Sequence, residues 1–100
     1  MAVKLLMTWD ILPGREQEYF EFVVRDFIPG MQRLGLEPSD AWFTMYGEHP
    51  QIMAAAQMPS LNLLNKVLES QEWADLVKLL MDYVEDFKVK IVPAQAGFQM

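Results

Sequence analysis

Cysteine is absent from this sequence, which excludes disulfide bonds, thiolate metal sites and a cysteine nucleophile. Histidine is scarce, with His49 as its only copy, and 8 basic residues stand against 14 acidic ones. The resulting net charge of -6 repels phosphate backbones and anionic lipid surfaces. We therefore expect no nucleic-acid partner.

Long apolar runs are also absent. No stretch approaches the roughly 20 apolar residues that a membrane-spanning helix needs. The first residues lack the apolar run and the small-residue cleavage site of a signal peptide. We expect a cytoplasmic protein without a membrane partner.

Apolar residues are plentiful, at 52% of the 100 residues. This share lies in the range of globular domains and far from the composition of disordered chains. The sequence therefore predicts a single domain over residues 1–100 with a small core.

The first half of the chain predicts a strand, a helix and a hairpin. Residues 3–11 mix β-branched, aromatic and apolar types and end at a Pro-Gly turn. Residues 15–34 place apolar side chains three and four apart, which predicts a helix that Pro29 and Gly30 either kink or break. Residues 41–47 and 51–58 then predict two paired strands.

The second half predicts two helical segments and a last strand. Ser60 and Ser70 are suitable N-caps, and apolar spacings of three and four continue to about Val84. Residues 87–91 alternate apolar and basic side chains, as expected of a strand with one wetter face. This order predicts an α+β, ferredoxin-like β-α-β-β-α-β domain with a four-stranded antiparallel sheet and both helical regions on one face.

Apolar residues on both faces of the first three predicted strands indicate a partner. Helices cover one face only, and an uncovered apolar face is unusual in a monomer. A second copy packed through the sheet face is the simplest cover, and the tail over residues 93–100 is the alternative. Residues 42–46 alternate in such a way that the sequence leaves open which side of the sheet meets the partner.

Three segments carry a resemblance to a known family. Residues 9–20 resemble the strand, Pro-Gly turn and acidic helix start of dimeric α/β barrel proteins, and residues 27–30 and 70–73 resemble NIPSNAP-type members. The resemblance implies two ferredoxin-like sheets packed face to face, with a pocket between each sheet and its own helices. That superfamily includes cofactor-independent monooxygenases, haem-degrading enzymes, lactone isomerases and proteins without an assigned activity. The haem-degrading members carry a helical histidine that this sequence lacks.

Three residues are candidates for proton transfer. His49 is of the residue type that titrates near neutral pH, but it is also typical of a surface turn. Asp10 ends the first strand and either reaches a pocket mouth or caps the following turn. Tyr46 completes the set.

Aromatic residues are candidates for a ligand site. Such side chains either line a pocket for a hydrophobic small molecule or simply fill the core. The candidates are Trp9, Tyr19, Trp42, Tyr46 and Trp73.

Metal and cofactor signatures are missing. One histidine among scattered carboxylates has no recognisable ligand spacing, and the glycines form no phosphate-binding loop. We expect no metal and no cofactor. Two functions remain open: a binding or interaction module built on a homodimer, and a cofactor-independent monooxygenase or isomerase acting on a hydrophobic aromatic substrate.

Overall fold

The computed structural model describes residues 1–46 and 49–94, without the side chains of residues 42–46, 49 and 50. Its elements follow in the order β1 (Val3–Ile11), α1 (Glu16–Phe22), η1 (Val23–Phe27), α2 (Ile28–Arg33), β2 (Glu37–Tyr46), β3 (His49–Met58), α3 (Leu61–Leu68), α4 (Gln71–Leu80) and β4 (Val84–Pro93).

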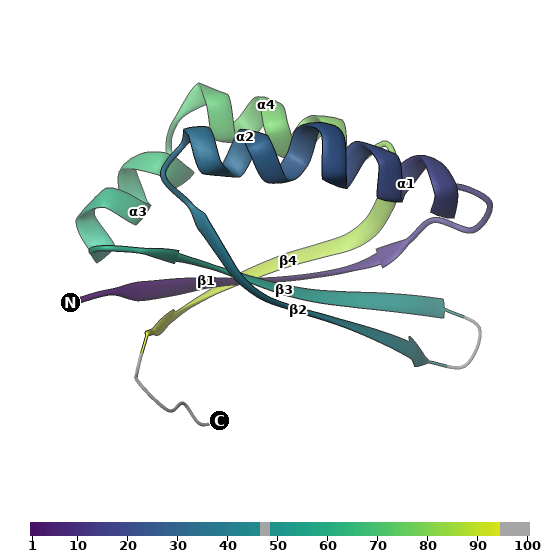
Figure 1. Cartoon of the computed structure of the whole chain (residues 1–100), viewed down its shortest axis with the longest axis horizontal. Coiled ribbons are helices and arrows are strands. Elements are labelled where there is room, and N and C mark those ends of the chain that lie inside the picture. Colours follow the sequence, from purple (N-terminus) through teal and green to yellow (C-terminus); the bar gives the residue numbers. More distant parts are fainter. Residues whose placement is uncertain (47–48, 95–100) are drawn as a thin grey trace.

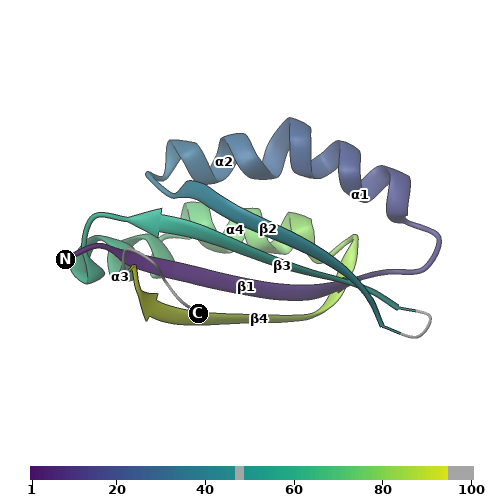
Figure 2. The ribbon, with the colours of Figure 1, turned by 60° about the horizontal axis from the view of Figure 1, so that its bottom comes forward.

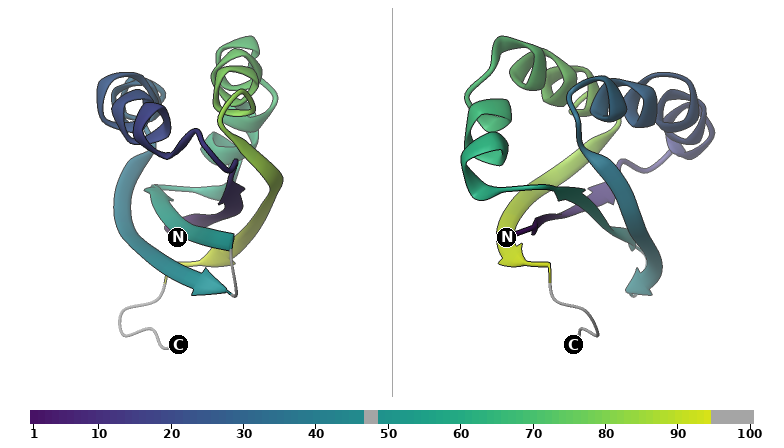
Figure 3. Two further views of the ribbon diagram at one scale, coloured as in Figure 1. Left: turned by 90° about the vertical axis from the view of Figure 1, so that its right-hand side faces the viewer. Right: turned by 60° about the vertical axis from the view of Figure 1, so that its left-hand side comes forward.

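The four strands form one sheet in the order β2-β3-β1-β4, and every neighbouring pair is antiparallel. The helices lie together on one face of this sheet (Figures 1 and 3). Figure 2 shows β2 and β4 as the two edges. The ferredoxin-like architecture predicted from the sequence is confirmed.

Strand β1 separates the two faces by strict alternation. Its odd-numbered residues from Val3 to Ile11 are buried beneath the helices, and the even-numbered residues between them are partly exposed. A strand directs successive side chains to opposite faces, so the position of each β1 residue follows from its number. The ladder to β3 continues this pattern, with Leu5 opposite Ala56 and Leu6 opposite Ala55.

Helix α1 continues into α2 through the π-helical segment η1. The N–H of Ile28 donates to the carbonyl oxygen of Val23, five residues back, and Pro29 lies in the first turn of α2. A wider π turn relieves the clash of a proline ring with the preceding turn. Pro29 therefore does not break the helix. Gly35, at φ +87°, ends it, as glycine commonly does at the C-terminus of a helix.

Both predicted serine caps are confirmed. The Ser60 hydroxyl accepts from the N–H of Leu63 at 3.2 Å, and the Ser70 hydroxyl accepts from the N–H of Trp73 at 3.2 Å. These bonds satisfy backbone donors that have no partner inside the helix.

The predicted end of the second helical region is wrong. Helix α4 stops at Leu80, and Val84 is buried at the start of β4. The carbonyl oxygen of Tyr83 accepts from the N–H of Leu12 at 2.9 Å, which draws the chain toward β1. This tertiary contact prevails over a helical spacing that continues to Val84.

A β-bulge in β4 keeps two apolar side chains on the helix side. Thr8 pairs with Lys88 but Asp10 pairs with Glu85, so β4 contains one extra residue at this point. Asp86 adopts φ 59°, a conformation that aspartate tolerates better than most residues. Val84 and Phe87 consequently both pack against the core.

No helix in the described part of the chain is long and apolar enough to cross a membrane.

Leu80 tests the register of α4. Its side chain is fully buried, whereas that of its neighbour Leu79 is 52% exposed. We expect Leu80→Ala to lower the free energy of unfolding by about 2 to 5 kcal/mol, through lost burial and the cavity left behind. Urea denaturation measures this change. Leu79→Ala is the matched control, and equal losses in the two variants would show that the register is wrong.

Candidate functional site

A small cavity lies between the sheet and the helix formed by α1, η1 and α2. Its volume is about 100 Å³. Apolar side chains from both layers make up most of its lining, including Trp9, Phe27, Met31, Ile52 and Ala54. The cavity therefore lies where the family resemblance implies a pocket.

Among the described residues that line this cavity, Trp9 and Tyr19 form a hydrogen bond between their side chains. The indole N–H of Trp9 donates to the Tyr19 hydroxyl oxygen at 3.0 Å, and both side chains are buried. The Trp9 ring also meets Phe27 edge-on at 5.9 Å and stacks on Phe87 at 5.8 Å between ring centroids. Four elements thus hold the indole in one orientation.

Burial changes the chemistry of the Tyr19 hydroxyl. Desolvation of the phenolate raises the pKa of Tyr19 to about 12, although the hydrogen bond from Trp9 acts in the opposite direction. Tyr19 is therefore a neutral phenol across the physiological pH range. It can donate and accept hydrogen bonds, but it cannot serve as a base.

The structure brings together two of the five aromatic candidates. Trp9 and Tyr19 line the cavity. Trp73 is buried in α4 and does not line it. The side chains of Trp42 and Tyr46 lie outside the described residues.

In the described part of the structure, no candidate for proton transfer lines this cavity. Asp10 has its place on the face of β1 opposite to Trp9, and it pairs with Gln51 and Glu85 across the ladders. The side chains of Tyr46 and His49 lie outside the described residues. Asp40, which was not a candidate, lines the cavity and forms an exposed ion pair with Lys4 at 3.3 Å.

Phe27 and Phe87 were not predicted as site residues. Phe27 belongs to the apolar stripe of the first helix, which is the available signal for it. Phe87 reaches Trp9 only because of the bulge in β4, and the sequence contains no direct signal for that bulge.

The opposite face of the sheet combines apolar and polar side chains. Its depression of about 430 Å³ is lined by Leu6, Thr8 and Met53 together with the β4 residues 88–90. Two of these β4 residues, Lys88 and Lys90, are exposed lysines. In the described part of this face, apolar residues form a central patch with a charged border.

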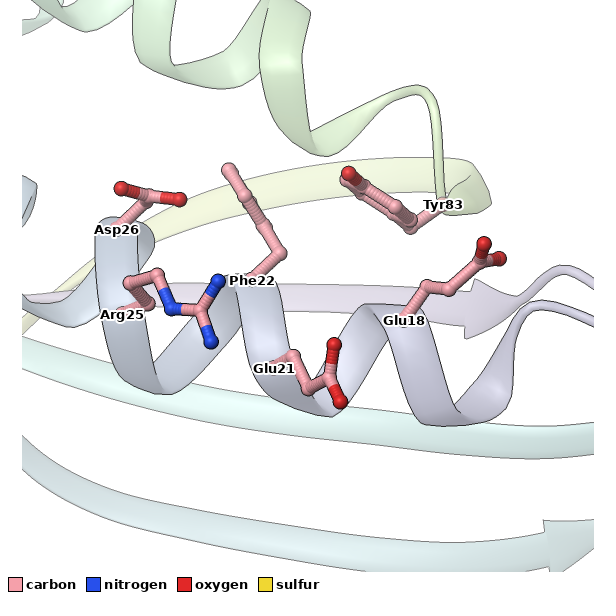
Figure 4. Close-up of a pocket in the computed structure, with 6 residues that line it drawn as sticks. All are labelled: Glu18, Glu21, Phe22, Arg25, Asp26 and Tyr83. Carbon is pink, nitrogen blue, oxygen red and sulfur yellow. The ribbon is translucent and has the colours of Figure 1, made fainter.

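A third depression lies between α1 and the turn before β4, and Figure 4 shows its residues. Phe22 and Tyr83 stack at 5.0 Å between ring centroids, and both line it. Charged side chains surround them: Glu18, Glu21, Arg25 and Asp26. Within the described residues, no group of three or more His, Cys, Asp or Glu side chains could hold a metal ion.

Comparisons by sequence find no match, either to a family model or to a curated protein. Solved structures do match. A NIPSNAP family protein from Agrobacterium tumefaciens shares 19% identity at a TM-score of 0.71, covering 95% of this chain and 94% of that one. An uncharacterised NIPSNAP domain protein from Burkholderia xenovorans shares 12% identity at a TM-score of 0.70, covering 100% of both chains.

A third neighbour is a dimeric protein of unknown function with a ferredoxin-like fold from Bacteroides fragilis. It shares 15% identity at a TM-score of 0.63, covering 92% of this chain and 95% of that one. At these identities the comparisons show a shared fold. It is the fold that the resemblance to NIPSNAP-type proteins implies.

The raised pKa of Tyr19 predicts a component of alkaline unfolding. Because its folded-state pKa of about 12 exceeds the usual 10.0, this group's contribution is fully present below pH 10 and is lost as pH rises through 12. The loss should reach about 2 to 3 kcal/mol. Denaturant unfolding across this pH range measures it. Tyr19→Phe should lack this component, and identical pH profiles for the two proteins would contradict the assignment.

Proposed function

We propose that this chain is a NIPSNAP-type binding protein that holds a small hydrophobic molecule between its sheet and helix α1–η1–α2. The apolar cavity beside Trp9 and Tyr19 carries this proposal. We further propose that two copies associate through the open sheet face, and that the protein works in the cytoplasm.

The lining of the cavity supports binding. Ligand sites are typically apolar, with a few polar groups that orient the ligand. Here Trp9, Phe27 and Ile52 supply the apolar surface, and the Tyr19 hydroxyl supplies the polar group. The volume of about 100 Å³ suits a compact molecule and is smaller than the 300 Å³ or more, roughly, of a drug-sized site.

The alternative, a monooxygenase or isomerase, has less support. Among the described residues that line the cavity, the ionisable side chains are those of Tyr19 and Asp40. Burial keeps Tyr19 protonated by raising its pKa, and Asp40 is exposed and paired with Lys4. Neither is placed as a general base is expected to be, close to a substrate and able to take its proton.

The open face of the sheet supports a second copy as partner. Leu6 and Met53 lie on this face, and the described helices all lie on the other. Burying such a face in a symmetric dimer would remove on the order of 800 Å² per chain, the size of a standard specific interface. The Bacteroides fragilis neighbour, whose fold is similar, is described as dimeric.

Ligand retention tests the binding proposal. We expect native mass spectrometry of the protein purified from its own cells to show an added small molecule that denaturation releases. Ala54 lines the cavity, so Ala54→Leu fills part of the space and should abolish this added mass.

Ala74→Leu is the matched control, because it makes the same change on an exposed position of α4. It should retain the ligand. A wild type without added mass calls for a second measurement, the change in unfolding temperature on addition of small apolar molecules. If this change is also the same in the wild type and in Ala54→Leu, the binding proposal is wrong.

Met53→Lys tests the homodimer. Met53 is 41% exposed on the open face and lines a depression that Lys88 and Lys90 also line. A third cation there would be buried without a partner in the dimer, at a cost of several kcal/mol. We expect light scattering at micromolar concentration to give twice the chain mass of 11.6 kDa for the wild type and the single chain mass for the variant.

Val24→Lys controls for the added charge, because Val24 is 71% exposed in the first helix, on the other side of the sheet. It should remain dimeric. A wild-type mass of 11.6 kDa would overturn the dimer without affecting the proposal for the cavity.

A further inference from the structure

The hydroxyl of Tyr19 is both an acceptor and a donor of hydrogen bonds. Its oxygen accepts from the indole N–H of Trp9, but its own O–H finds no acceptor among the described residues. Tyr19 is only 3% exposed and lines the cavity. A buried donor without a partner is costly, at about 1 to 3 kcal/mol, so the site gains if an acceptor enters.

The contact with Trp9 sets the direction of this donor. The O–H bond of a phenol prefers to lie in the plane of the ring, where it has two possible orientations. The indole N–H of Trp9 approaches the oxygen from the side of one of them. The proton therefore turns away from Trp9. An acceptor on that side of the oxygen would complete the hydrogen bonding of the hydroxyl.

The surroundings exclude a charged ligand. The cavity is lined mostly by apolar side chains, and a buried charge without a counter-ion costs many kcal/mol. The carboxylate of Asp40, a residue of the lining, is already paired with Lys4 and so does not serve as a counter-ion in the cavity. A neutral ligand avoids this cost.

We infer that the cavity takes a neutral, compact molecule with one acceptor oxygen, a small ketone or ether, bound by the O–H of Tyr19. This inference rests on the proposed binding function and names the class of ligand. A volume of about 100 Å³ limits the size, because a dry cavity of roughly 150 Å³ holds one benzene molecule.

Cyclopentanone and methylenecyclopentane provide a matched pair of probes, because they differ only in C=O against C=CH₂. We expect the indole N–H signal of Trp9 to shift in NMR titrations with both. Cyclopentanone should bind at least roughly fivefold more tightly, since only its oxygen can accept from Tyr19. Butyrate, an anion of similar size, should bind more weakly than either.

Tyr19→Phe keeps the ring and removes the donor. In this variant the preference for cyclopentanone should disappear, while methylenecyclopentane should bind as tightly as before or more tightly. If the variant does not fold, the comparison of the two probes on the wild type still decides the matter.

Each outcome has a separate meaning. Equal affinity of the wild type for both probes, or tighter binding of butyrate, would overturn this inference and leave the binding proposal intact. If no probe binds to the wild type, both the inference and the proposed cavity site are wrong.

Discussion

The structure depends on how the indole of Trp9 is held between the sheet and the helices. Its N–H must find an acceptor once it is buried, and Tyr19 from α1 supplies one at 3.0 Å. Its ring must be covered on the remaining sides, and Phe27 from η1 and Phe87 from β4 contact it. Strand β1, the first helix and the last strand therefore meet at this residue. The cavity lies beside these contacts and takes its polar group from them.

The sequence predicted the fold correctly where the pattern lies within a few neighbouring residues. The Pro-Gly turn after β1 and the two serine caps act over a few residues, and all appear in the structure. The errors lie where distant contacts decide. Val84 has helical spacing from Leu80, but the bond between Leu12 and Tyr83 and the bulge at Asp86 place it in β4. The effect of Pro29 likewise depended on a π turn that no sequence pattern indicates.

The candidate site was less predictable for a physical reason. Aromatic residue types identify side chains that suit a pocket, but they do not distinguish Trp9 from Trp73, which lie in different layers. The cavity itself is a gap in packing. Two small side chains, Ala41 and Ala54, lie opposite each other on β2 and β3, next to the register shift between Pro38 and Asp40. A cavity of this kind depends on how completely the side chains of the sheet and of the helices together fill the space between the two layers. No single position in the sequence encodes it.

The two faces of the sheet carry different chemistry because buried and partly exposed residues alternate along β1, and β3 is paired with β1 in register. Leu6 and Met53 are on the open face with lysines near them, whereas Trp9 and Ile52 are enclosed beneath the helices. A ligand that is held by Tyr19 therefore does not touch the face at which a second copy would dock. The proposed binding in the cavity and the proposed association of two chains would therefore use opposite faces of one sheet.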